Sequence, residues 1–431
     1  MNEGRKLFDT LSMEQREKRL QRSGVEASLI RQDKLVFKNN EGKAKPIMTG
    51  SAETHSLRYR LYIYNLAVLK ITPIRTGSGM KSLLTTDESV QSAAPLQRRG
   101  LTKLLEGLAV RALYSLGLDS GEVLLLNKGD RRYVVEEISP PKEIAGEPLI
   151  EPYRTAELKW MRILSRELPG RPGMLMGMDP EFLLQRGDAG HVVPASRYLP
   201  TDGVAGCDGG PPGTRGTFPV AELRPRPRRE PRALLAQLMS AAATADRLIA
   251  DRSLAWRAGG MPLRGWALGG HLHFSGVVLT APLLRALDNY LALPMLLLED
   301  SRAAARRPRY GVLGDFRYQP HGGFEYRTLP SFLVSPVVAK GAVYLAHLIV
   351  SRYEDLPLRP LDREDLHAAY YRGDKTPLRP AFAPLQGQLR ALSGYELAAR
   401  YIEPLFSYIA EGSTWNEARD IRGLWCVQEA P

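Results

Sequence analysis

The sequence contains very little cysteine, with only Cys207 and Cys426 in 431 residues. Both a disulfide framework and a thiolate zinc site need more thiols, so a reducing compartment fits better. The first twenty residues are charged and lack the apolar segment of a secretory signal. The longest apolar stretch, 333–350, is interrupted by proline, lysine and histidine, which predicts a buried helix rather than a membrane span. We therefore expect a cytoplasmic protein without a membrane partner.

The chain has ample apolar residues and an excess of positive charge. Hydrophobic residues make up 44% of the sequence, and 59 basic against 47 acidic residues give a net charge of +12. A basic excess favours anionic partners, which include nucleic acid, nucleotides and acidic lipid. Apart from one dense run at 224–232, the basic residues are scattered. This distribution indicates phosphate handling rather than a continuous track for nucleic acid, so we do not expect nucleic acid as a partner.

Composition and turn signals divide the chain into an α+β protein with two modules. A length of 431 residues suggests two or three domains at ~150 residues each. No internal repeat is visible. The expected parts are a polar N-terminal segment at 1–50, a small α+β module at 51–145, a linker with a helix at 146–171, and a larger module at 172–431.

Periodicity predicts the elements within these parts. Before the larger module we expect an amphipathic helix at 13–22, a hairpin at 56–72 around Asn65, a loop at 74–96, a helix at 98–116, strands at 122–127 and 131–138, and a linker helix at 155–168. In the larger module we expect helices at 232–258, 281–307 and 333–354, and an interrupted helical tail at 361–425.

The larger module repeats one pattern in four short strands. Residues two apart in a strand point to the same face. Each strand places two polar groups on one face and apolar residues on the other: Asp179 and Glu181, Glu222 and Arg224, His271 and His273, and Glu325 and Arg327. Pro180 removes a ladder donor, so the first of these strands is expected at a sheet edge or at a bulge.

If these strands share one sheet, its polar face gathers four carboxylates, two imidazoles and two guanidiniums. The negative charge exceeds the positive by about two when histidine is neutral. Clustered carboxylates do not stay ionised without compensation, and oxygen-rich ligand sets suit Mg²⁺ or Mn²⁺. Taken singly, each pair also fits a solvated strand edge or a surface ion pair. Their occurrence together in one module favours a joint site.

Other groups lie near this face in the sequence. Arg317 and His321 come just before the last strand. Arg302, Arg306 and Arg309 fit one helical face, where they could grip phosphate or simply be solvated. The glycine-rich loop at 206–219 allows close approach to a ligand or closure as a lid, and it lacks the ending of a P-loop. Cys207 in this loop is expected to be an incidental small residue.

The order of these motifs resembles the phage-type carboxylate–amine ligases, also called type 2 amidoligases, of the glutamine synthetase and glutamate–cysteine ligase superfamily. The resemblance covers about 172–425 and rests on GMDPEF, GCDGGP followed by VAELRP, GGHLHF, and YGVLGDFRYQPHGGFEYRTLPSFL. It implies a curved antiparallel sheet with helices on its outer face, together with ATP and Mg²⁺ as cofactors. It also implies an acyl phosphate that an amine then displaces. The implied substrates are small-molecule or peptide carboxylates and amines.

The resemblance also implies individual roles. The implied metal ligands are Asp179, Glu181, Glu222, His271 and Glu325. Arg317 and Arg327 resemble phosphate clamps and His273 resembles the histidine that faces the phosphates, so these three are the implied catalytic groups. The implied ATP-binding residues are Arg224, His273, Arg317 and Arg327.

The smaller module has a resemblance of its own. The segment LGLDSGEVLLLNKGDRRYVVEEISP is similar to the C-terminal end of an ATP-grasp ligase, in which two strands carry Mg²⁺-binding acids. Glu137 matches one glutamate. Ser139 stands where asparagine is expected, and Leu124 stands where the first acid would be. These departures predict an inactive, partial module.

Three functions stay open at this point. The first is an ATP-dependent ligase that forms an amide. The second is a phosphotransferase of guanidino-kinase type on the same sheet, and the third is a non-catalytic binding scaffold. The sequence identifies neither the acid nor the amine, and it leaves the oligomeric state open.

Overall fold

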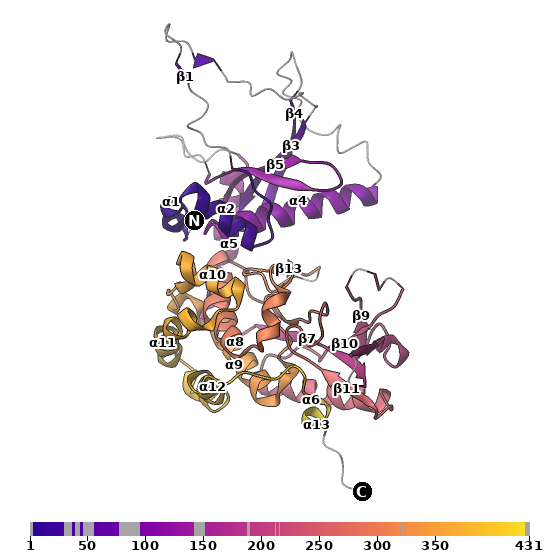
Figure 1. Ribbon diagram of the computed structural model, residues 1–431. Helices are drawn as coiled ribbons and strands as arrows, with labels where there is room; N and C mark the ends of the chain where they lie inside the picture. Colours follow the sequence, from indigo (N-terminus) through magenta and orange to yellow (C-terminus); the bar gives the residue numbers. More distant parts are fainter. Residues whose placement is uncertain are drawn as a thin grey trace. The chain divides into compact units, whose positions relative to one another are not determined.

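The protein forms two compact units, Met1–Ile163 and Leu164–Pro431, each of which combines helices with antiparallel sheet (Figure 1). The computed structural model describes residues 3–29, 37–38, 44–45, 56–76, 95–141, 151–187, 190–211, 213–214, 216–320 and 322–426. The predicted α+β class is confirmed. The division between the units falls inside the predicted linker, 146–171.

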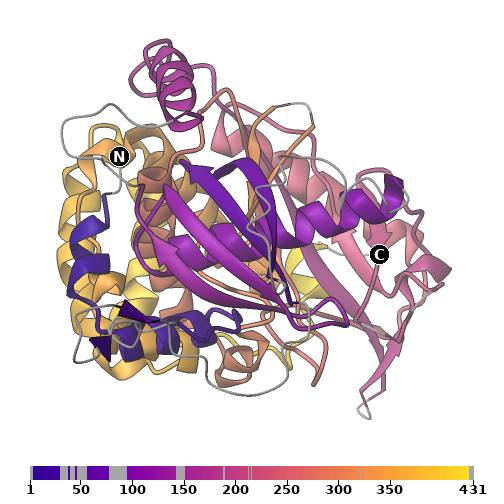
Figure 2. The ribbon, with the colours of Figure 1, turned by 90° about the horizontal axis from the view of Figure 1, so that it is seen from above.

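The first unit contains a four-stranded antiparallel sheet in the order β4-β3-β5-β6, with α4 packed on one face (Figure 2). The predicted hairpin is confirmed, and Asn65 and Leu66 form its turn with positive φ angles of 42° and 63°. The predicted loop at 74–96 overlaps the end of β4 and the start of α4, and most of it lies outside the described residues. The elements are α1 (Arg5–Thr10), α2 (Met13–Arg22), β1 (Phe37–Lys38), β2 (Ala44–Lys45), β3 (Ser56–Tyr64), β4 (Ala67–Thr76), α4 (Pro95–Ser115), β5 (Gly121–Asn127), β6 (Tyr133–Ser139) and α5 (Tyr153–Leu164).

The second unit is built on a larger antiparallel sheet, in which the described strands follow the order β13-β14-β12-β7-β10-β9 and β8 and β11 also pair with β7. All four predicted polar strands belong to this sheet. Its strands are β7 (Leu175–Arg186), β8 (His191–Val193), β9 (Ala205–Asp208), β10 (Val220–Leu223), β11 (Leu254–Arg257), β12 (Gly270–Ser275), β13 (Phe316–Tyr318) and β14 (Phe324–Tyr326).

The prediction that the first polar strand lies at a sheet edge or is bulged at Pro180 is wrong, because its pairing with β12 runs through Pro180 without a register shift. Strand β7 is central, with β12 on one side and β10 on the other. The ladder with β10 ends at the pair Glu222 and Glu181, one residue before Pro180 would need a donor on that side. On the other side the Glu181 N–H donates to the carbonyl of Gly269. Proline is therefore tolerated in a central strand because its missing N–H faces the end of a ladder.

Helices and short helical turns complete the second unit. Helix α9 and the helical tail confirm the predictions at 333–354 and 361–425. The helical elements are η2 (Ala195–Arg197), α6 (Pro231–Leu248), α7 (Ala281–Leu287), η3 (Asp288–Ala292), α8 (Leu293–Leu298), η4 (Ser301–Arg306), η5 (Phe332–Val334), α9 (Pro336–Arg352), η6 (Tyr353–Asp355), η7 (Pro360–Asp362), α10 (Glu364–Arg372), α11 (Lys375–Ala391), α12 (Tyr395–Ala410) and α13 (Arg422–Trp425).

Two predicted helices are too long. The helix expected at 232–258 ends at Leu248, and β11 follows because Trp256 packs its ring against Phe182, with ring centroids 4.5 Å apart, while its strand pairs with β7. The helix expected at 281–307 ends at Leu298. This run consists of α7, the π-helical turn η3 and α8. The residues that follow form η4, a separate 3₁₀ turn capped by Asp300.

The run Ala281–Leu298 is long and apolar enough to cross a membrane by length and composition. However, 94% of this run is buried inside the protein, as expected for a core helix of a folded domain. The run that the sequence singled out as the longest apolar stretch contributes the core helix α9.

Candidate active site

The register of the sheet brings the predicted polar residues to one face. Residues directly opposite each other in antiparallel strands point to the same side. His271 lies opposite Asp179, and His273 lies opposite both Gly177 and Glu325. Glu222 lies opposite Glu181, and Arg317 lies opposite Glu325. In β12 the two imidazoles alternate with buried Leu272 and Phe274, which turn toward the core.

Asp179 is the centre of this arrangement. Its Oδ2 lies 2.9 Å from Nε2 of His273, and its Oδ1 lies 3.2 Å from Nδ1 of His271. The same Nδ1 lies 3.3 Å from Oε1 of Glu325. One carboxylate from β7 and one from β14 therefore flank the two imidazoles of β12, the strand between them.

Glu325 is the most enclosed of these groups, with its side chain 2% exposed. Nε of Arg317 lies 3.2 Å from Oε2 of Glu325, and Nε of Arg327 lies 3.1 Å from Oε1. Gln319 also donates from Nε2 to Oε2 at 3.0 Å. The two arginines predicted to bind phosphate thus both contact Glu325, the predicted metal ligand. Gln319 is a further contact of Glu325 that the sequence did not predict.

Glu181 and Glu222 form the other end of the site. The carboxylate of Glu181 accepts the backbone N–H of Gly269 at 2.7 Å. A Cβ at position 269 would lie 2.3 Å from Nε2 of His271, so any larger residue there would displace the imidazole. Glu222 pairs with Arg224, which also donates to the carbonyl of Thr201 at 3.0 Å. Arg224 is therefore tied to Glu222 and to the preceding loop.

Burial and neighbouring charge shift the acids of this face in opposite directions. Burial raises the pKa of Glu222 to about 9, helped by the charge of Asp179 and opposed by Arg224. Burial likewise raises the pKa of Glu181. Burial opposes ionisation of Asp179 too, but His271 and His273 hold the pKa of that carboxyl well below its usual range. The two imidazoles thus favour the ionised form of Asp179, whereas at Glu222 burial outweighs the opposing charge of Arg224, so both Glu181 and Glu222 keep raised pKa values.

The donor set fits a divalent cation. Asp179, His273 and Glu325 can each offer one ligand atom, and these atoms all lie within 4.8 Å of one another. The buried Oδ1 of Asp179 and Nε2 of His273 make no well-directed hydrogen bond with the described residues. Carboxylate oxygens with imidazole nitrogen suit Mg²⁺ or Mn²⁺ better than a thiolate-binding metal.

An apolar wall borders the acidic end of the site. The next cross-strand pair on the same face of β7 and β10 is Leu183 and Val220. These two side chains pack with Leu268 and with the partly buried Leu263 and Trp266. Leu263, Trp266 and Leu268 belong to the loop between β11 and β12, residues 258–269, which places apolar side chains beside the two acids and agrees with their raised pKa values.

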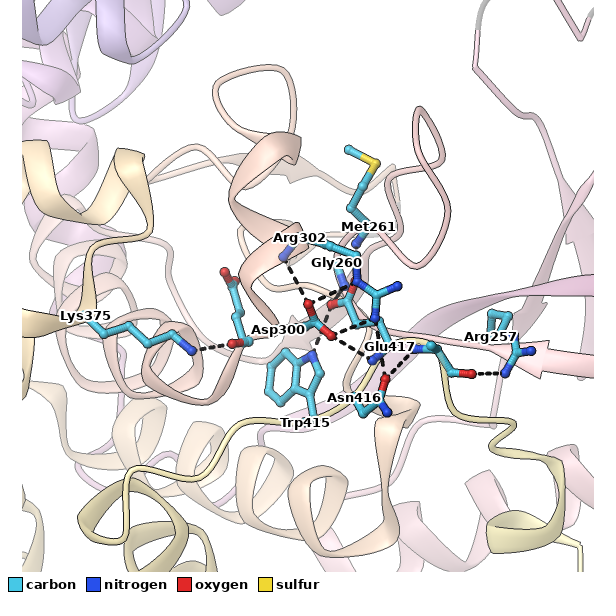
Figure 3. Close-up of polar contacts among 11 residues, drawn as sticks. Arg257, Gly260, Met261, Asp300, Arg302, Lys375, Trp415, Asn416 and Glu417 are labelled. Atoms are coloured by element: carbon cyan, nitrogen blue, oxygen red, sulfur yellow. Dashed lines mark hydrogen bonds and ion pairs between the residues drawn. The ribbon is translucent and has the colours of Figure 1, made fainter. Parts of the chain in front are cut away.

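Glu417, from the C-terminal part of the chain, holds the base of this loop (Figure 3). Its fully buried carboxylate accepts the N–H of Gly260 at 2.5 Å, the N–H of Met261 at 2.8 Å and the indole N–H of Trp415 at 3.0 Å. Glu417 also donates its own N–H to Asp300 at 3.2 Å. No local sequence pattern reveals this contact, which spans 157 residues.

Other predicted groups lie elsewhere. Arg306 is buried and donates to the carbonyls of Thr328 and Leu329 at 3.1 and 3.0 Å, so it supports the end of β14 and does not present a solvent-facing charge. It belongs to a 3₁₀ turn rather than an α-helix. Cys207 is buried in β9. His321 and two positions of the predicted lid, 212 and 215, lie outside the described residues.

The sequence profile of the family described as phage phiEco32-like COOH.NH2 ligase-type 2 matches residues 176–427. This segment is more than half of the chain and contains every predicted site residue. The protein therefore belongs to this family, which confirms the predicted class of carboxylate–amine ligase. No protein of curated function matches the chain.

Several solved structures show weaker likeness. A bifunctional glutathione synthetase from Pasteurella multocida is 10% identical at a TM-score of 0.37, with 61% of this chain covering 51% of that one. A novel glutamine synthase homolog is 14% identical at 0.24, covering 64% and 79% of the two chains. Plasmodium falciparum glutamine synthetase is 9% identical at 0.28, covering 74% and 72%. This protein thus spans about half the length of the glutathione synthetase.

Proposed function

We propose that this protein uses ATP and Mg²⁺ to join a carboxylate to an amine through an acyl phosphate. Family membership supports the ligase class. The observation that carries the rest is the convergence of Asp179, His273 and Glu325 within 4.8 Å, with Arg317 and Arg327 beside Glu325. Phosphoryl transfer needs positioning and charge neutralisation more than a covalent nucleophile, and this face offers both.

Two groups of residues would hold the cations. Asp179, His273 and Glu325, with His271 alongside, form one ligand set, and the cross-strand pair Glu181 and Glu222 forms a second. Bound Mg²⁺ would neutralise charge on the phosphates and polarise the transferred phosphoryl group. Gly269 leaves space for the His271 ring and fixes the Glu181 carboxylate through its N–H.

The reaction that we propose has two balanced steps. An oxygen of the substrate carboxylate attacks the γ-phosphorus of ATP, the bond to the β,γ-bridging oxygen breaks, and ADP leaves. The nitrogen of the amine then attacks the acyl carbon, the bond from that carbon to the phosphate oxygen breaks, and inorganic phosphate leaves as the amine gives up a proton.

Arg317 and Arg327 are suited to the first step. Their side chains are 57% and 29% exposed, although each also contacts buried Glu325. Because both side chains are partly exposed, they can turn toward phosphate oxygens without disturbing the packing of the core. Guanidinium groups bind such oxygens in a bidentate way and stabilise the charge that develops during transfer.

The test is ADP release by the full chain with ATP and Mg²⁺, across a panel of amino acids, short peptides and amines. We expect release that depends on both an acid and an amine, that EDTA abolishes, and that Mg²⁺ or Mn²⁺ restores. The mass of the product separates an amide from a phosphorylated guanidine, and the latter would overturn the ligase proposal. Absence of ATP binding by calorimetry with Mg²⁺ present would refute nucleotide-dependent chemistry altogether.

A further inference from the structure

The helix run Ala281–Leu298 is interrupted by one π-helical turn, Asp288–Ala292. Its first three residues, Asp288, Asn289 and Tyr290, are buried and polar, and they bond to distant segments of the unit. Asn289 accepts the N–H of Leu361 at 3.0 Å, and the Tyr290 hydroxyl accepts the N–H of Leu358 at 2.9 Å. Such turns occur frequently at functional sites.

Asp288 is directed to the hairpin that carries the arginines and Glu325. Its Oδ1 accepts the hydroxyl of Tyr326 at 2.8 Å and the backbone N–H of Gly314 at 3.0 Å. Tyr326 lies between Glu325 and Arg327 in sequence and is fully buried on the opposite face of β14. A single carboxylate oxygen thus contacts both arms of the hairpin.

The two arms carry most of the phosphate side of the site. Gly314 has a φ of 70° and leads into β13, which holds Arg317. The N–H of Arg327 donates to the carbonyl of Asp315 at 2.9 Å, which links the arms again beside the Asp288 contact. Moving Asp288 would therefore shift Arg317, Glu325 and Arg327 together.

We propose that Asp288 is a positioning residue that sets the hairpin β13–β14 against the histidines of β12. The test of this inference by metal binding rests on the proposed function, because that test takes Glu325 as a metal ligand. Asp288 is buried and bonds to Tyr326, whose side chain lies on the face of β14 opposite Glu325, so its role is to hold Glu325 and the two arginines at the geometry that the site needs. Groups outside the ligand shell tune metal affinity in this way.

Asp288→Ala removes both contacts, and Tyr326→Phe removes one hydroxyl at nearly constant volume, which keeps the test valid if the first variant does not fold. The probe is Mn²⁺ alone, titrated against the full chain by electron paramagnetic resonance. We expect its Kd to rise about 10-fold or more in both variants, as for other residues outside the ligand shell. Asn289→Ala is the matched control, because it disturbs the same buried turn but bonds away from the hairpin.

The outcomes separate a positioning role from a merely structural one. Lower thermal stability in all three variants with an unchanged Mn²⁺ Kd would overturn the inference. If the wild-type protein binds Mn²⁺ but releases no ADP, the proposed function fails while the positioning test remains valid. If it binds no Mn²⁺, hydrogen exchange at the Arg327 amide decides the question. Exchange should be faster in Asp288→Ala than in Asn289→Ala, and equal rates would refute the positioning role.

Discussion

Replacing Glu325 by glutamine tests the metal assignment most directly. The substitution preserves the size of the side chain and removes its charge at a position that is 2% exposed. Loss of a residue outside the ligand shell typically costs about 10–100-fold in metal affinity or activity, so loss of a ligand should exceed that range. We therefore expect Glu325→Gln to lower turnover more than about 100-fold.

The same substitution should leave the protein folded. Hydrogen bonds to charged groups contribute about 1.5–3 kcal/mol each. The partners Arg317 and Arg327 are 57% and 29% exposed, so water replaces part of what is lost. The free energy of unfolding should fall by about 1–3 kcal/mol, compared with a typical stability of about 5–15 kcal/mol.

The assay is ADP release under saturating ATP and Mg²⁺, with urea unfolding measured on the same samples. Glu354→Gln is a matched control. Glu354 pairs with Arg171, a buried arginine in the same unit, but it lies outside the candidate site. It should lose stability and keep turnover. If Glu325→Gln keeps wild-type turnover, or if both variants lose turnover in proportion to stability, the assignment of Glu325 as a metal ligand is wrong.

Three further substitutions test Arg327, the first unit and the loop before β12. Arg327→Ala should lower kcat at least about 100-fold with little change in stability, and steady-state kinetics showing a wild-type kcat would remove Arg327 from phosphate binding. Glu137→Ala in the first unit should leave ligase turnover unchanged, and a large loss would restore an active ATP-grasp role for that unit. Glu417→Ala leaves two backbone donors and an indole without their acceptor, so urea unfolding should show a loss of about 3 kcal/mol, and an unchanged midpoint would show that the loop base is held by other contacts.

The sequence predicted the four polar strands because their information is local. In β12, His271 and His273 alternate with Leu272 and Phe274, and this period of two fixes which groups face the site. The repeated pattern favoured a joint site, and the structure supplies the shared sheet on which that prediction depended. The neighbours of each strand did not follow from it, and Pro180 was misread as an edge signal because the end of the β10 ladder depends on a partner far along the chain.

The supporting contacts could not be predicted from the sequence. Asp288 and Tyr326 are 38 positions apart, and Glu417 and Gly260 are 157 apart. A buried acid in an apolar helix signals that some partner exists, but not which one. The π-helical turn likewise depends on Asp288, Asn289 and Tyr290 finding partners in the β13–β14 hairpin and in residues 358–361, both far along the chain.

The structure changes the charge argument that first indicated a metal. Counting the whole face gave a deficit of about two positive charges when histidine is neutral. The described contacts compensate Glu325 with two arginines and Asp179 with two imidazoles. Among the described residues, Arg224 pairs with Glu222, which faces Glu181 across two strands beside an apolar wall, so one guanidinium serves these two buried acids. Because burial raises the pKa of both acids there, added positive charge would gain most at this pair, while the histidine side already has the geometry of a ligand set.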